Sequence, residues 1–244
     1  MRKILSIIAP VFLLLITSCE EKPDCFKGTG PLTSEERSTT PIRHIELLCN
    51  ADVIIHPDTV NRIKVTTGAN LIGKIETEIK DDMVWIRNNN HCNWVRSFDP
   101  TLKVEIWTDD LLTIRTDDSN GDVTFSDTLH VREFRFDSFS SLGTYHILLD
   151  AEIATIALHN GPADFYGEGN IEVAYYYSSG YGIMDFRNMI ADLIFMNNRG
   201  TNDMYVNAQS RIEARIEDSG DIFYRGNPVV QKVITGSGKM LPLQ

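Results

Sequence analysis

The chain has 244 residues, with 34 acidic side chains against 23 Lys and Arg, and a net charge of −11 at pH 7. An acidic surface repels phosphate at long range, so no nucleic acid partner is expected. This length, with 42% hydrophobic residues, is enough to bury a substantial core.

The N-terminus has the features of a targeting segment. A basic start precedes an apolar run over residues 4–16, which is shorter than the roughly 20 residues that a membrane span needs. The run ends in Leu15-Ile16-Thr17-Ser18-Cys19, which resembles a bacterial lipobox; an ordinary secretory signal is the alternative. We predict a signal peptide over residues 1–18 and lipidation of Cys19, which would make this an outer-membrane lipoprotein facing the cell surface or the periplasm.

Residues 19–40 are polar and contain two prolines, so we predict a tether between the lipid and the folded body. Three cysteines remain, in a compartment that permits disulfides. Cys49 follows two leucines and is expected to pack as a small hydrophobic residue. We therefore predict a disulfide between Cys25 and Cys92 that joins the tether to the body.

Strand signals dominate from residue 41 onward. Apolar and polar residues alternate in short segments separated by Gly, Pro, Asn and Asp, which is the pattern of an all-β protein. Helical periodicity is limited to a possible single turn over residues 70–74. The segments lie at 45–47, 53–55, 63–65, 75–79, 84–86 and 102–106.

A glycine recurs every 18 to 22 residues through the second half of the chain, and the segments around it alternate again. This period predicts a single-stranded β-helix-like stack of roughly 20-residue coils. We expect glycine at the bends because bends often need positive φ. We predict one domain over residues 41–244, with the first half wound as wider coils. The recurring residues are Gly121, Gly143, Gly161, Gly180, Gly200, Gly220 and Gly238.

Six acids cluster just before and within the first of these coils. Turn formation is the favoured interpretation, while Ca²⁺ binding and polysaccharide cleavage stay open as alternatives. No histidine or cysteine spacing matches a metal site, and no cofactor is predicted. The acids are Asp109, Asp110, Asp117, Asp118, Asp122 and Asp127.

Aromatic residues gather on two neighbouring coils, in Tyr175-Tyr176-Tyr177 and around Tyr181 and Phe186. On alternating strands some of these rings must face outward, where tyrosine suits sugar rings or protein partners. We select Tyr176 and Tyr181 as predicted ligand contacts. The alternative is that the odd-numbered rings fill the core and Tyr176 merely lies on the surface.

A family resemblance rests on residues 218–228, Asp-Ser-Gly-Asp-Ile-Phe-Tyr-Arg-Gly-Asn-Pro, and on the later Gly236-Ser237-Gly238-Lys239. These motifs resemble the ending of the head GIN domain family of auto-transporter adhesins. Segments 24–30 and 90–97 look like stretches of its lipoprotein members, and the resemblance covers roughly residues 40–240. It implies a right-handed β-helix-like body and brings no catalytic residues. The bends at Gly143 and Gly200 lack the Asp that the family usually has.

These observations predict an envelope-anchored lipoprotein, not an enzyme, that presents a β-helical surface to a glycan or a surface protein. One alternative is a carbohydrate-active enzyme, a lyase or hydrolase, which would need a cleft with two carboxylates and a perturbed pKa. The other is a structural envelope protein that associates with itself.

Overall fold

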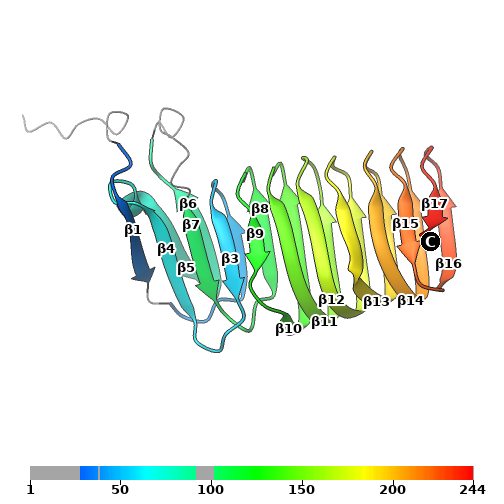
Figure 1. The fold of residues 1–244 in the computed structure, drawn as a ribbon, viewed down its shortest axis with the longest axis horizontal. Helices are drawn as coiled ribbons and strands as arrows, with labels where there is room; N and C mark the ends of the chain where they lie inside the picture. The colour runs from blue at the N-terminus through cyan, green and yellow to red at the C-terminus, as the bar shows by residue number, and fades with distance from the viewer. Residues whose placement is uncertain (1–27, 38, 92–101, 244) are drawn as a thin grey trace, which may run out of the picture.

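A computed structural model describes residues 28–37, 39–91 and 102–243. Within them the chain is all-β, with 63% of residues in strands, and winds into a β-solenoid of about six turns with coils about 20 residues apart (Figure 1). The predicted fold class is confirmed. The signal peptide, Cys19 and the Cys25–Cys92 disulfide lie outside the described residues and stay predictions.

Six of the seven N-terminal strands, all but the first, coincide with the six segments predicted from alternation, and the predicted helical turn is the 3-10 turn η2 (Ile72–Lys74). The strands are β1 (Leu32–Arg37), β2 (His44–Leu47), β3 (Asp52–His56), β4 (Arg62–Gly68), β5 (Ile75–Lys80), β6 (Met83–Asn88) and β7 (Lys103–Trp107).

The coils of the second half are built from longer strands that continue around a bend. Their bounds are β8 (Thr113–Asp117), β9 (Val123–Phe125), β10 (Leu129–Phe139), β11 (Thr144–Leu158), β12 (Asp164–Ser178), β13 (Met184–Asn198), β14 (Met204–Ile216), β15 (Ile222–Arg225), β16 (Val229–Ile234) and β17 (Met240–Pro242).

Successive coils pair in parallel, so that each strand lies on the equivalent strand of the next coil (Figure 1). The first face consists of β3, β7, β9, the first halves of β11 to β14, β15 and β17. The second face consists of β2, β6, β8, β10, the second halves of β11 to β14, and β16. Because side chains alternate across a strand, each face has one set of residues inside the coil and one set outside.

The core lies between the two faces. Tyr145 on the first face packs against Phe136 on the second, with ring centroids 4.8 Å apart, and also against Phe165 of the next coil at 4.9 Å. The buried apolar cluster is continuous from Ile42 to Met240. Burying each large side chain contributes about 1.5–3 kcal/mol to stability. Because rings such as Tyr145 contact the next coil as well as their own, this burial also holds neighbouring coils together.

The N-terminal part is not the run of wider coils that the sequence analysis predicts. The rung formed by β2 and β3 lies between the β6–β7 rung and the β8–β9 rung, all parallel. Beyond it, β4 pairs antiparallel with β7 and with β1, and β5 pairs antiparallel with β6. The predicted tether over residues 19–40 is also too long, because β1 belongs to the folded body.

The recurring glycines have a different cause from the one predicted. Of the seven, only Gly161 has positive φ, at 89°. A Cβ on Gly143 would lie 2.1 Å from the carbonyl oxygen of Gly121, and one on Gly238 would lie 2.3 Å from that of Gly220. Glycine is therefore required because successive bends approach too closely for any side chain.

Aspartates fasten the same bends to one another. The carboxylate of Asp122 accepts the backbone N–H of Thr144 at 2.8 Å, and that of Asp164 accepts the N–H of Ile183 at 2.7 Å. The same bond from Asp221 reaches the N–H of Lys239 at 2.7 Å. Each bond joins one coil to the next, so these side chains satisfy backbone donors that the strand ladder leaves unpaired at the bends.

We predict that Gly143→Ala lowers the free energy of unfolding by about 1–3 kcal/mol, the usual cost of forcing extra atoms into a packed site. Urea denaturation followed by circular dichroism measures the change. Gly73→Ala is the matched control, because nothing lies within 4 Å of a Cβ at that position. Equal stability of the two variants would contradict the close-approach explanation.

Candidate ligand-binding site

The tyrosine run on β12 divides between the core and the surface. Tyr176 is 2% exposed, and its ring stacks on Phe186 with centroids 4.4 Å apart. Burial also raises the pKa of its phenol. The prediction that Tyr176 contacts a ligand is therefore wrong, since β12 turns the even-numbered residues inward here and leaves Tyr175 and Tyr177 outside.

A groove of about 570 Å³ runs along the solenoid on the outer side of the second face. Its floor is the backbone around Tyr176 and the residues paired with it on later coils. Two ladders of outward side chains, one residue from each coil, form its walls. One wall is Thr155, Tyr175, Phe195, Glu213 and Gln231, and the other includes Tyr177, Asn197, Arg215 and Val233.

The N-terminal end of the groove is aromatic. Tyr175 is 44% exposed and stacks on Phe195, with ring centroids 5.3 Å apart and planes 18° from parallel. Thr155 precedes Tyr175 in the same wall, and its side chain is too small to cover the other face of the ring. This end therefore presents a partly exposed aromatic pair to a ligand.

The C-terminal end of the groove is polar. Arg211 pairs with Glu213 at 2.7 Å and donates to the Gln231 amide oxygen at 2.8 Å. The Asn197 amide nitrogen donates to Glu217 at 3.1 Å, whereas its oxygen Oδ1 is buried and accepts no hydrogen bond from the described residues. An unpaired buried acceptor is costly, and because Oδ1 is buried it is not exposed to a ligand in the groove.

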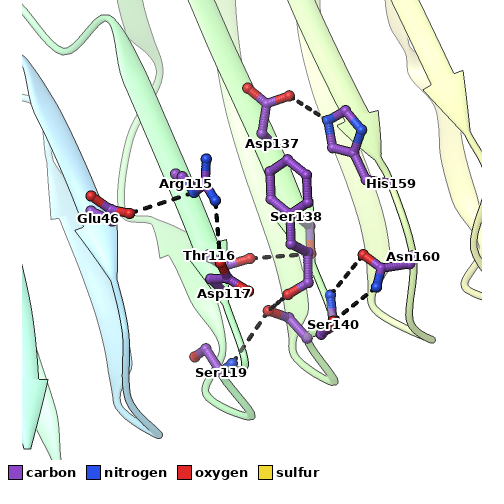
Figure 2. A network of polar contacts seen from close by, with 12 residues as sticks. Glu46, Arg115, Thr116, Asp117, Ser119, Asp137, Ser138, Ser140, His159 and Asn160 are labelled. Atoms are coloured by element: carbon purple, nitrogen blue, oxygen red, sulfur yellow. Dashed lines mark hydrogen bonds and ion pairs between the residues drawn. The ribbon is translucent and has the colours of Figure 1, made fainter.

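A network of polar contacts ends beside the Tyr177 wall, and Figure 2 shows its part around Asp137 and His159. His159 stacks on Phe139, with centroids 4.1 Å apart, and its ring lies 5.5 Å from that of Tyr177. The Asp137 carboxylate bonds the His159 Nε2 atom at 2.7 Å, and the Arg115 guanidinium lies 4.4 Å from the Phe139 ring. His159, which contacts the Tyr177 ring, is therefore held in position by Asp137 and Phe139.

Asp137 interacts electrostatically with both Arg135 and His159. Burial alone raises the pKa of its carboxyl group, but hydrogen bonds from Arg135 and His159 outweigh burial and lower that pKa below its usual value. The same hydrogen bond raises the pKa of Arg135. The carboxylate therefore stays charged at neutral pH and orients His159.

The six clustered acids do not form a common site. Asp122 and Asp127 accept backbone N–H groups at bends, while Asp110 and Asp117 pair with Arg43 at 2.9 Å and with Arg115 at 3.2 Å. Within the described ranges, no group of three or more His, Cys, Asp and Glu residues could hold a metal ion. Four of the six therefore act as bend or ion-pair residues.

Cys49 has a free thiol that packs against the core, and burial raises its pKa to about 12. It therefore has the predicted character of a small hydrophobic residue. Tyr181 is 64% exposed at the bend after β12 but does not line the groove. Its contact with a ligand stays a prediction.

The sequence analysis did not single out Phe195, Asn197, Arg215 or Gln231. The signal that could have found them is the coil period itself. Starting from Tyr175, a step of one coil reaches Phe195, then Glu213 and Gln231. The steps are unequal because the number of residues per coil varies, and this variation hides the ladder in the sequence.

The fold and the groove together define a β-solenoid that presents an elongated open surface. The chain belongs to the family described as putative auto-transporter adhesin, head GIN domain, whose model matches residues 43–228. The predicted family is thereby confirmed. No functionally curated protein matches the chain in sequence.

Solved structures share this fold at low sequence identity. A putative adhesin from Bacteroides fragilis NCTC 9343 superposes with a TM-score of 0.81 at 18% identity, over 87% of this chain and 97% of that one. A putative lipid binding protein from Parabacteroides distasonis ATCC 8503 has a TM-score of 0.71 at 19% identity, over 89% and 98%. A putative adhesin from Parabacteroides merdae ATCC 43184 has a TM-score of 0.62 at 15% identity, over 89% and 98%.

The described part of the chain contains no helix with the length and apolar character to cross a membrane. Membership of the adhesin family indicates a cell-surface protein, which is one of the two locations that the sequence analysis left open.

We predict that Asp137→Asn lowers the free energy of unfolding at pH 7 by about 1.5–3 kcal/mol, the worth of hydrogen bonds to a charged group. The lowered pKa means that the charged carboxylate contributes stability above the unfolded pKa of about 3.9. That contribution is lost as the pH falls through the lower folded-state pKa.

Denaturation of the wild type and the variant between pH 2 and pH 8 tests this, and the two stabilities should converge at the acid end. Glu133→Gln on the same strand is the control, because Glu133 is exposed and makes no ion pair with the described residues. A stability difference independent of pH would contradict the electrostatic role of Asp137.

Proposed function

We propose that the protein is an envelope-anchored adhesin whose groove on the second face binds a linear glycan. The observation that supports this most directly is the shape of the groove, which follows the solenoid axis over five successive coils. Coils repeat every 4.8 Å or so, and an extended polysaccharide advances by a similar distance for each sugar. A chain-like ligand therefore meets an equivalent pair of wall positions at every step.

The chemistry of the walls also suits a saccharide. The exposed Tyr175–Phe195 pair can stack on the apolar face of a sugar ring. Asn197, Glu213 and Gln231 line the groove and offer amide and carboxylate groups for hydroxyls. A volume of about 570 Å³ falls within the range of about 300–1,000 Å³ that is typical of ligand sites.

Binding is favoured over cleavage by the distribution of carboxylates. Glycoside hydrolysis uses two carboxyl groups about 5–10 Å apart, one of which must stay protonated. Among the side chains that line the groove, Glu213 is the single carboxylate, and it is ion-paired with Arg211. The groove therefore presents a recognition surface without a paired acid and base.

The N-terminal segment supports attachment to the envelope. The lipobox-like Leu15-Ile16-Thr17-Ser18-Cys19 would place a lipid at the start of the mature chain. The described body begins at the β1 end of the solenoid, so the stack would extend away from that attachment point (Figure 1). This arrangement would expose the long faces to ligands.

We predict that Tyr175→Ala weakens glycan binding about tenfold or more, a loss of at least 1.4 kcal/mol, because the stacking platform is removed. A microarray of linear oligosaccharides identifies the ligand, and titration calorimetry with the best one measures the affinity. Tyr175→Phe keeps the ring and should bind nearly as well as the wild type. Leu142→Ala is the control, since Leu142 is 57% exposed outside the groove.

Three results would count against this proposal. Unchanged glycan affinity in Tyr175→Ala would show that the groove is not the binding site. A loss of affinity confined to Tyr181→Ala would show that the glycan contacts the bend instead. New reducing ends or unsaturated products after incubation with the oligosaccharide would support an enzyme instead.

We predict that Cys19→Ala transfers the protein from the membrane fraction to the soluble fraction, because the thiol that carries the lipid is lost. Cell fractionation with immunoblotting measures the distribution. Cys49→Ala is the control, since that thiol packs against the core. Retention of Cys19→Ala in the membrane fraction would refute lipid anchoring.

A further inference from the structure

A second concave site lies on the outer side of the first face, centred on β13. It is a hollow of about 260 Å³ whose lining includes Tyr166, Glu168, Asp185, Arg187, Asn188 and Arg225. Tyr176, beneath the groove, packs directly on Phe186, beneath the hollow. The hollow and the groove therefore open on opposite sides of the core.

A bulge in β13 creates the hollow. Between Asp185 and Ile190, β13 contains more residues than the facing segment of β14, and its pairing with β12 is also irregular between Tyr166 and Glu168. Phe186 of the bulge occupies the space beside Gly167, where a Cβ would lie 2.7 Å from the Phe186 ring. Bulges re-aim side chains and are frequent next to functional sites.

One side of the hollow is rigid. The Arg187 Nε atom donates to both carboxylate oxygens of Asp185, at 2.8 and 3.0 Å, and its guanidinium lies 4.8 Å from the centre of the Tyr205 ring. The backbone carbonyl of Arg187 accepts a hydrogen bond from the Asn207 amide at 3.1 Å. The arginine is thus held before any ligand arrives, which lowers the cost of binding.

Aromatic rings continue on both sides of this pair. His146 stacks on Tyr166 with centroids 5.2 Å apart, and Tyr205 stacks on Phe223 at 5.1 Å. On the coil between these two stacked pairs, the equivalent strand position holds Asp185, which is paired with Arg187, instead of an aromatic residue. The hollow is therefore the one break in an otherwise aromatic ladder over these five coils.

Three polar side chains around the hollow, those of Glu168, Asn188 and Arg225, make no hydrogen bond or ion pair with any described residue. Arg225 does attract the Asp185 carboxylate electrostatically. Glu168 accepts hydrogen bonds, Arg225 donates them, and Asn188 does both. Together they offer acceptors and donors around a small volume bordered by tyrosine.

We propose that this hollow is a second saccharide site, which takes a single neutral sugar residue at a chain end or a branch. Its two guanidinium groups are balanced by the carboxylates of Glu168 and Asp185, so the site carries no net charge that would select an acid. Its 260 Å³ lies below the usual range of ligand pockets, about 300–1,000 Å³, which suits one ring better than a chain. The site goes beyond the proposed function because it uses the opposite face.

Two sites on opposite faces would allow one molecule to bridge two glycans. The groove would hold the length of a chain, and the hollow would hold a terminus. Bridging raises the effective affinity for a surface that displays both, without any new contact.

Saturation-transfer NMR with a panel of neutral monosaccharides (hexoses, N-acetylhexosamines and deoxyhexoses) tests the second site on the full folded body. We expect at least one sugar to bind the wild type and Tyr175→Ala equally. Glu168→Gln and Arg225→Ala should each lower the affinity for that sugar at least tenfold. The matched controls are Glu172→Gln and Arg132→Ala, which change the same residue types outside the hollow, and thermal melting verifies that every variant is folded.

The proposal is overturned if no sugar of the panel binds, or if binding is insensitive to both Glu168→Gln and Arg225→Ala. It is also overturned if uronic or sialic acids bind through Arg225 while neutral sugars do not. Failure of the groove gives a different result, since linear oligosaccharides would then bind equally to the wild type and Tyr175→Ala.

Discussion

The structure depends on the in-register pairing of one coil with the next. Parallel pairing fixes which residue of each coil lies above which, as in Ile156 on Tyr176 and Tyr176 on Met196. A slip of one residue would reverse every side chain between core and solvent. The same register is held by the apolar interior, by the glycine contacts at the bends and by the aspartate bonds between bends. Each of these contacts therefore favours the register that the others need.

The same constraint determines the shape of the two candidate sites. Outward side chains in register form straight ladders, and the space between two ladders is a groove parallel to the axis. The second face shows this regular case between the Tyr175 and Tyr177 ladders. The first face shows the exception, because the bulge near Arg187 interrupts the register and leaves a compact hollow. Regular pairing therefore suits a chain, and a local defect suits a single ring.

Much of the fold could be predicted because its determinants are local. Alternation gives the strands, and the glycine period gives the coils. The position of the β6–β7 rung before β2–β3 could not be predicted, since equivalent apolar strands fit several places in a stack. The orientation of Tyr176 was also missed. Three consecutive tyrosines suit either phase of the strand, and only the neighbouring inward residues Ala174 and Ser178 decide it.

The fold constrains its residues unequally, and this inequality explains why the family can be identified more readily than its ligand. Most inward positions are apolar, and bend positions such as Gly143 and Asp122 must keep their size or their bonding. Outward positions such as Phe195 and Arg225 are free of both demands. Binding chemistry can therefore change from coil to coil while the stack is preserved. A ligand must accordingly be inferred from the outward ladders of this chain, because the motifs that identify the family are those of the bends.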